Sequence, residues 1–298
     1  WPTGRGFDEF YGFLKSMRTY FGKTPGNPIY RNETPEGAKE GYLTDSFNEE
    51  AVSFINRHSH QQQPFFMYVP YNAPHYPMEA RADYLREFKT GNKARDLYLA
   101  MMKSVDEGVG MMMDALKKNK TYENTLIIFL SDNGGIPNKG GNNGVLRGEK
   151  GQNYEGGIRV PFLVSWPKVL PAGQINSTPV ISIDIFPTVI GASGEDPAIK
   201  YPNLDGKNML PNLIAPRTPH HELLFWKNNH SWAVRKNNHK LIYIKSKGQK
   251  KVTLELYDLK NDISESNDLA KVLPDKVKEL TALYENWDAK NIKLPNQW

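Results

Sequence analysis

Two polar residues, Asp132 and Asn133, follow directly on an apolar run, Leu126–Leu130, and two glycines come next. The length and β-branched content of that run predict a buried strand. In open α/β sheets, ligands bind in loops at the ends of such strands. Both polar side chains offer oxygen, which hard cations such as Ca²⁺ prefer as a ligand. A simple turn without a ligand is the alternative that this short sequence also allows.

Two further residues have side chains suited to an anionic ligand. Lys150 lies in a loop between Gly148 and Gly151, where its compact ammonium group is free to reach an anion. His75 follows a second apolar run, Phe65–Tyr71, and lies in a segment whose two prolines stiffen the backbone. Taken alone, such a histidine is more often an ordinary residue of a surface loop.

The sequence around these residues resembles the motifs of one enzyme family. The segments SDNGG at 131–135 and LRGEKGQNYEGGIRVP at 146–161 resemble, at this spacing, the C-terminal half of the type I sulfatase signature. Type I sulfatases are formylglycine-dependent members of the alkaline phosphatase superfamily. The segments APHYP at 73–77 and PTGRGFDEFYG at 2–12 also resemble sulfatase segments, and all four occur in the family's order.

The resemblance implies a role for each candidate residue. Asp132 and Asn133 match the metal ligands that bind Ca²⁺ in the family. His75 and Lys150 match catalytic residues that contact the sulfate group. A divalent cation and these two side chains would stabilise the charge that develops when a nucleophile attacks sulfur.

Parts of the sulfatase active site have no counterpart in this sequence. Sulfatases use a formylglycine nucleophile made from Cys or Ser in a C/S-x-P-x-R motif, which the chain lacks, as it lacks cysteine altogether. The acidic pair that completes the Ca²⁺ shell and the Lys-x-His segment have no counterpart either. Because the resemblance already begins at Gly6, we expect a C-terminal portion of a sulfatase. We expect its Ca²⁺ site to be incomplete, the formylglycine to lie in an N-terminal portion of the same enzyme, and the chain alone to be inactive.

The expected function is that of a sulfuric ester hydrolase acting on a sulfated small molecule or carbohydrate. The carbohydrate expectation depends partly on the segment Pro219–Trp226, whose imidazole and indole groups are suited to a sugar, although Trp226 fits a protein core equally well. A phosphodiesterase or phosphonate hydrolase of the same superfamily is an alternative, because the scaffold is shared. Those relatives, and some sulfatases, tend to carry Asp-His at the metal position, and Asn133 argues against Zn²⁺ and for Ca²⁺. The other alternative is a non-catalytic protein that binds sulfate or glycans.

Composition excludes several other classes of protein. The chain has 298 residues, 39% of them hydrophobic, which suffices for a substantial core in one or two domains. Its net charge of +5 favours anionic ligands, but no arginine-rich stripe or zinc-finger spacing indicates a nucleic acid partner. The lack of cysteine excludes disulfides and thiolate metal sites. No apolar run has the length of a membrane span.

The order of predicted elements is that of an α/β protein. A strand at Phe65–Tyr71, the histidine loop, a long helix over 94–118 and the strand before Asp132 follow one another as in a doubly wound sheet. We therefore predict part of an alkaline-phosphatase-like sheet in residues 1–215. Residues 216–298 are predicted to form a small antiparallel α+β subdomain, beyond a boundary rich in Pro and Asn.

Several local structures are also predicted. Residues 13–44 are expected to be irregular, and Ser46 with Glu49 to form the capping box of a helix. Arg147, Glu155 and Arg159 are expected to serve packing and positioning rather than catalysis. The remaining predicted elements are a strand at 162–166, a helix from 183, four C-terminal strands with the sequences LLFW, WAVR, HKLIYI and LELYDL, and a helix over 272–290.

Overall fold

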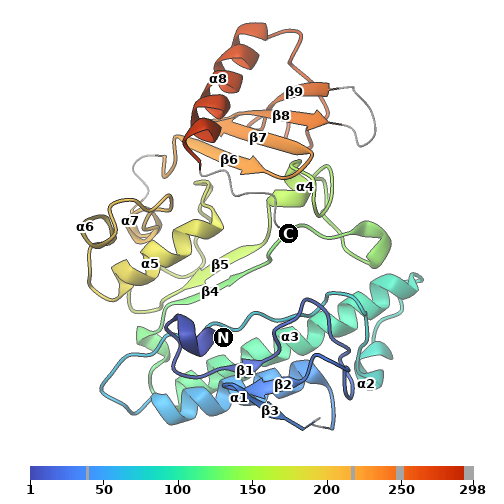
Figure 1. The fold of residues 1–298 in the computed structure, drawn as a ribbon, viewed down its shortest axis with the longest axis vertical. Helices are drawn as coiled ribbons and strands as arrows, with labels where there is room; N and C mark the ends of the chain where they lie inside the picture. Colours follow the sequence, from blue (N-terminus) through green and yellow to red (C-terminus); the bar gives the residue numbers. More distant parts are fainter. Residues whose placement is uncertain (38–39, 216–218, 246–251, 292–298) are drawn as a thin grey trace. The chain divides into compact units, whose positions relative to one another are not determined.

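The computed structural model describes residues 1–37, 40–215, 219–245 and 252–291 (Figure 1). The chain divides into two compact units. The first comprises residues 1–125 and 137–141, and the second comprises residues 126–136 and 142–298. The boundary predicted between residues 215 and 216 falls at residues outside the described ranges, so that domain division stays a prediction.

The first unit is built on two long helices and a small antiparallel ribbon. Its elements are η1 (Pro2–Arg5), β1 (Tyr11–Gly12), β2 (Ile29–Arg31), β3 (Thr34–Glu36), α1 (Leu43–His58), α2 (Ala82–Leu85), α3 (Lys93–Lys118), η2 (Tyr122–Asn124) and η3 (Pro137–Lys139). Helix α3 confirms the helix predicted over 94–118. Its first N–H groups are capped by the Asn92 side chain, which accepts hydrogen bonds from the backbone of Ala94 and Arg95.

Helices α1 and α3 approach each other closely at a glycine. A Cβ added to Gly108 of α3 would lie 2.0 Å from Oδ1 of Asn48 of α1, so only glycine fits there. Asn48 in turn donates a hydrogen bond from Nδ2 to the carbonyl oxygen of Ser104, at 3.0 Å. This contact fixes how the two helices of the first unit pack.

Two predictions for this unit are wrong. Helix α1 begins at Leu43, not at a capping box on Ser46. Leu43 is buried in a cluster with Tyr20 and Met101, and this packing favours an earlier start of the helix. Residues 65–71 form no strand. Within the described residues no neighbouring strand pairs with them, and backbone groups that lack a partner strand cannot form a ladder.

The predicted irregular region 13–44 also contains regular structure. Strands β2 and β3 lie within it and pair antiparallel, with Tyr30 opposite Pro35. β2 pairs in addition with β1, which lies just before the region. The other described residues of the segment are largely without helix or strand, as predicted.

The second unit contains two separate sheets and the remaining helices. Its elements are β4 (Ile127–Leu130), α4 (Glu155–Ile158), β5 (Phe162–Ser165), η4 (Ser182–Asp184), α5 (Ile185–Ala192), α6 (Pro197–Lys200), α7 (Leu210–Ile214), β6 (Leu223–Lys227), β7 (Ser231–Lys236), β8 (His239–Lys245), β9 (Val252–Asp258) and α8 (Pro274–Lys290). Strands β4 and β5 pair antiparallel, with Leu130 opposite Phe162. The apolar run predicted a buried strand, but the residues of β4 are only half-buried.

The C-terminal sheet has the predicted four strands and final helix. Strands β6, β7, β8 and β9 form an antiparallel meander in chain order. Helix α8 covers one face, where Trp287 stacks on Phe225 with ring centroids 4.7 Å apart and Tyr284 stacks on Trp232 at 3.9 Å. Large aromatic contacts of this kind supply much of the burial that keeps a helix on a sheet.

In the described part of the chain, no helix is both long and apolar enough to cross a membrane.

Candidate active site

The loop after β4 presents Asp132 and Asn133 with their oxygens uncommitted. The Ser131 hydroxyl donates to the Asn133 carbonyl at 2.8 Å, and Nδ2 of Asn133 donates to the Gly134 carbonyl at 3.0 Å. These bonds close the turn and engage the nitrogen of the Asn133 amide, which leaves its oxygen available. Asp132 is exposed, and among the described residues no hydrogen bond or ion pair engages its carboxylate.

The oxygens of this turn are of the type that Ca²⁺ prefers, but two residues do not make a complete site. Calcium takes six to eight oxygen ligands. Asp132 and Asn133 therefore fit a Ca²⁺ ion as part of its shell, and the other oxygens have to come from elsewhere. The incompleteness of the site and the identity of the metal both stay predictions.

The glycines around this turn allow three stretches of backbone to touch. The Gly134 N–H donates to the Gly157 carbonyl at 3.0 Å, and a Cβ on Gly134 would lie 1.7 Å from the Gly156 carbonyl oxygen. A Cβ on Gly156 would itself lie 2.5 Å from the Gly148 carbonyl oxygen. The loop after β4 is thus packed directly against the segment that starts α4, and no side chain fits between them.

Asn143 joins the candidate metal loop to the loop that carries Lys150. Its Oδ1 accepts the Gly135 N–H at 2.8 Å, while its Nδ2 donates to the carbonyls of Gly135 at 3.0 Å and Gly148 at 2.9 Å. The sequence did not single out this residue, since an asparagine in a run of Gly and Asn indicates only a turn. Asn143 is a positioning residue, because it acts on the site through two backbone segments.

Lys150 lies at the tip of its loop with its ammonium group exposed. Gly148 and Gly151 adopt positive φ angles of 84° and 86°, a conformation that side chains rarely tolerate. Within the described ranges no hydrogen bond or ion pair engages the Lys150 side chain. The loop thus presents a positive charge whose position depends on the backbone rather than on a partner.

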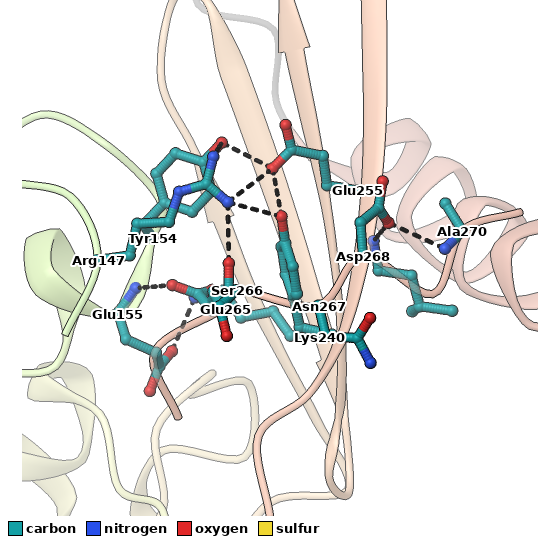
Figure 2. Close-up of polar contacts among 12 residues, drawn as sticks. Arg147, Tyr154, Glu155, Lys240, Glu255, Glu265, Ser266, Asn267, Asp268 and Ala270 are labelled. Atoms are coloured by element: carbon teal, nitrogen blue, oxygen red, sulfur yellow. Dashed lines mark hydrogen bonds and ion pairs between the residues drawn. The ribbon is translucent and has the colours of Figure 1, made fainter. Parts of the chain in front are cut away.

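Arg147 fastens the start of the same loop to the C-terminal sheet (Figure 2). Its Nη1 donates to the Tyr257 hydroxyl at 2.7 Å and to the Glu265 carbonyl at 2.9 Å, and its guanidinium lies over the Tyr154 ring at 4.1 Å. The hydroxyls of Tyr154 and Tyr257 both donate to Glu255. Burial raises the pKa of Tyr154, and the hydrogen bond to Glu255 adds to the effect.

The end of the loop is held by a buried ion-pair network. Lys240 of β8 is fully buried and lies 2.7 Å from Oε1 of Glu155 and 2.8 Å from Oε1 of Glu265. Glu265 also accepts the Glu155 N–H through Oε2, at 2.7 Å. Figure 2 shows Glu155, at the start of α4, pointing toward Lys240 and Glu265. Arg147 and Glu155 therefore serve packing and positioning, as predicted. Arg159 pairs with Glu155 at 3.6 Å.

His75 lies in the first unit, in a loop held by Tyr20. The buried Tyr20 hydroxyl donates to the carbonyls of Asn72 at 2.8 Å and of His75 at 3.0 Å. Nδ1 of the exposed His75 lies 2.8 Å from the Tyr76 carbonyl. A carbonyl only accepts, so Nδ1 carries the proton and Nε2 is left for a ligand. The convergence of His75 with Lys150, which lies in the other unit, stays a prediction.

The segment proposed to meet a sugar is turned inward instead. His220 is buried and the side chain of His221 is 7% exposed, with both imidazoles directed toward Asp184. Trp226 packs against the core cluster that contains Ala233 and Ile242. The prediction that these imidazole groups are available to a carbohydrate is therefore wrong, because burial removes them from solvent.

Comparison with known proteins decides the family. A sequence profile for sulfatases matches residues 2–195, and a profile for the C-terminal part of N-sulphoglucosamine sulphohydrolase matches residues 148–286. The chain belongs to the sulfatase family. This sulfatase chain is 33% identical to the sulfatase YdeN of Escherichia coli K12, over 94% of its own length and 55% of that protein. It is 30% identical to N-acetylgalactosamine-6-sulfatase of Canis lupus familiaris, over 80% of its own length and 48% of the relative.

The fold of the sulfatase chain is also that of a solved structure. Ps i-CgsB in complex with k-i-k-neocarrahexaose matches with a TM-score of 0.87 and 36% sequence identity. The match covers 96% of this chain and 67% of that one. The predicted α/β class and the sulfatase resemblance are both confirmed. The chain spans about half the length of the curated relatives that it matches.

Proposed function

We propose that this chain provides part of the active site of a Ca²⁺-dependent carbohydrate sulfatase. The observation that carries the proposal is the pair of loops joined by Asn143. Within the described residues, one loop presents oxygens of Asp132 and Asn133 that have no partner, and the other presents the Lys150 ammonium group, which has none either. Membership of the sulfatase family supports sulfuric ester hydrolysis as the reaction. The N-acetylgalactosamine-6-sulfatases and the neocarrahexaose complex among the relatives support a carbohydrate substrate.

Each residue has a distinct part in this proposal. Asp132 and Asn133 supply two of the oxygens that hold the cation. Lys150 places a positive charge against a sulfate oxygen, where it stabilises charge that increases in the transition state. His75 contributes a ring nitrogen to the same anion through Nε2. When bound, Ca²⁺ would polarise the sulfur–oxygen bonds.

The covalent step requires a nucleophile that the sequence does not contain. No residue from His75 to Lys150 provides a hydrated aldehyde, and charge stabilisation without a nucleophile opens no covalent route. We therefore infer that the chain by itself gives no sulfatase turnover, with or without Ca²⁺. A longer protein that contains this sequence together with the formylglycine segment would supply both halves.

The test compares the chain with the protein encoded by the complete reading frame. Both are assayed with Ca²⁺ on an aryl sulfate and on neocarrahexaose. The proposal expects hydrolysis by the complete protein and none by the chain. Turnover by the chain alone that survives repurification and disappears in Lys150→Ala would refute the inferred inactivity. An aryl phosphate and a phosphonate monoester serve as competing substrates, and faster hydrolysis of either would favour the phosphodiesterase or phosphonate hydrolase alternative.

A further inference from the structure

Three side chains with metal-ligand chemistry meet in the interior of the second unit, in a cluster formed by Asp184, His220 and His221. Asp184 ends η4, and the two histidines precede β6. Nε2 of His221 lies 2.9 Å from both Asp184 carboxylate oxygens, and Nε2 of His220 lies 3.4 Å from Oδ2. One ligand atom from each residue lies within 4.8 Å of the other two. The exposed fractions of the Asp184, His220 and His221 side chains are 0%, 4% and 7%.

One nitrogen of this cluster is buried without a hydrogen-bond partner. Among the residues that the structure describes, Nε2 of His220 has no hydrogen-bond partner, and its 3.4 Å distance to Oδ2 of Asp184 exceeds the usual range for N–H···O bonds. A buried polar atom without a partner costs free energy, and native structures rarely keep one unless a water or an ion completes it. Nε2 of His220 is directed at the same carboxylate as Nε2 of His221, so a single cation could contact all three groups.

Hydrogen bonds from surrounding residues hold the side chains of the cluster in place. The Asp184 carboxylate accepts the N–H groups of Ile181 at 2.9 Å and Lys207 at 2.8 Å. Nδ2 of Asn212 lies 3.0 Å from Nδ1 of His220, and because an amide nitrogen only donates, Nδ1 is the acceptor here. Metal-binding histidines instead donate their second ring N–H, so a cation on Nε2 requires the Asn212 amide to turn and present Oδ1 to Nδ1. The hydrogen-bonded Asp184 carboxylate already resembles a metal-binding carboxylate. Of the charged groups nearby, Lys207 directs its ammonium to the His220 carbonyl at 3.2 Å.

The chemistry of the three side chains indicates the class of cation. One carboxylate with two imidazoles is a ligand set for a borderline cation. The loop after β4 offers only oxygens and differs in this respect.

We propose that Asp184, His220 and His221 bind one divalent transition-metal cation, with Zn²⁺ as the ion that the ligand set fits best. Three protein ligands leave a fourth tetrahedral position for water. The site connects η4 to the entry of β6 across 37 positions of the chain. The burial of all three ligand side chains favours a structural role, in which the cation holds η4 to the entry of β6. None of its three residues is among those assigned to the sulfate chemistry above.

The experiment measures Zn²⁺ binding by the chain itself, with any affinity tag removed. The protein is stripped with a chelator, incubated with Zn²⁺, desalted at neutral pH and analysed for metal by mass spectrometry. We expect one equivalent of Zn²⁺ per chain, a higher Tm with Zn²⁺ than without it, and visible absorption typical of tetrahedral coordination when Co²⁺ replaces Zn²⁺.

Variants separate this site from adventitious binding. His220→Gln and His221→Asn should each lower the Zn²⁺ affinity by more than tenfold, and Asn212→Ala by about tenfold through loss of ring orientation. The control His230→Ala, which removes an exposed histidine outside the cluster, should bind as the wild type does.

The outcomes are decisive without any activity assay. Folded wild-type protein that retains no more Zn²⁺ than His220→Gln would overturn the proposal. Equal affinity in the wild type, His220→Gln and His221→Asn would place the bound metal elsewhere and overturn it as well. If His220→Gln fails to fold, the stoichiometry and Co²⁺ spectrum of the wild type, together with His221→Asn, still decide. The sulfatase proposal would be untouched by any of these results.

Discussion

Replacing Lys240 with methionine tests how much the buried ion-pair network beside the Lys150 loop contributes to the free energy of unfolding. The change keeps an unbranched side chain of similar length but removes the ammonium that lies 2.7 Å from Glu155 and 2.8 Å from Glu265. The two carboxylate side chains are 4% and 0% exposed, so both would be left buried. Arg159 offsets little of this charge, because it lies 3.6 Å from Glu155 with a side chain that is 52% exposed.

Removing one partner of a buried ion pair typically costs about 3–5 kcal/mol. We expect Lys240→Met to lose free energy of unfolding in this range, measured by urea titration with a probe that reports on the C-terminal sheet. Lys245→Met is the matched control, because it makes the same change at an exposed position of β8. Its effect should stay within about 0.5 kcal/mol.

A rescue variant isolates the cause. Adding Glu155→Gln and Glu265→Gln to Lys240→Met removes the uncompensated charges and should restore at least half of the lost stability. A loss below about 1 kcal/mol in Lys240→Met would refute the reasoning, because a buried pair of carboxylates cannot lose its cation at so small a cost. A large loss with no recovery in the triple variant would indicate that packing, rather than charge, is responsible.

Three further predictions concern the loops and the final helix. Gly134→Ala should destabilise the second unit by about 1–3 kcal/mol or more, since its Cβ would lie 1.7 Å from the Gly156 carbonyl, whereas Gly110→Ala, whose Cβ meets nothing within 4 Å, should not; equal thermal stabilities would contradict this. Asn143→Ala should abolish protection of the Gly135 amide from hydrogen exchange, and unchanged protection in this variant would exclude the bond. Hydrogen bonds from Lys236 and Lys276 lower the pKa of Glu279 from 4.5 to about 2. The stabilisation by Glu279 should therefore be present above pH 4.5 and fade toward pH 2, so Glu279→Gln should weaken the protein at neutral pH but not at pH 2.

The sequence predicted the elements whose signals are local. Helix α3 was predicted from the apolar periodicity of residues 94–118. Strands β6 to β9 alternate with turn residues and were predicted individually. The start of α1 was not, because the burial of Leu43 depends on packing against residues distant in the sequence. The run at 65–71 has the composition of a strand, but a strand also needs a partner, which composition does not reveal.

The sequence pointed to those residues of the candidate site that lie within family motifs. Asp132, Asn133 and Lys150 stand out because family motifs surround them. Asn143 does not, because its function is to hold two backbone segments together and only the fold places them within its reach. The cluster of Asp184, His220 and His221 was hidden for the same reason, since its members come from separate elements of the chain.

The central claim is that Lys150 acts on a sulfate ester, and one measurement addresses it directly. Lys150→Ala and the control Lys168→Ala, which removes another exposed lysine of the second unit, are made in the complete protein. The steady-state hydrolysis of an aryl sulfate is then measured in the presence of Ca²⁺. We expect kcat to fall by about a hundredfold or more in Lys150→Ala and to stay unchanged in Lys168→Ala. Wild-type turnover by folded Lys150→Ala would contradict the assignment of this loop to the active site.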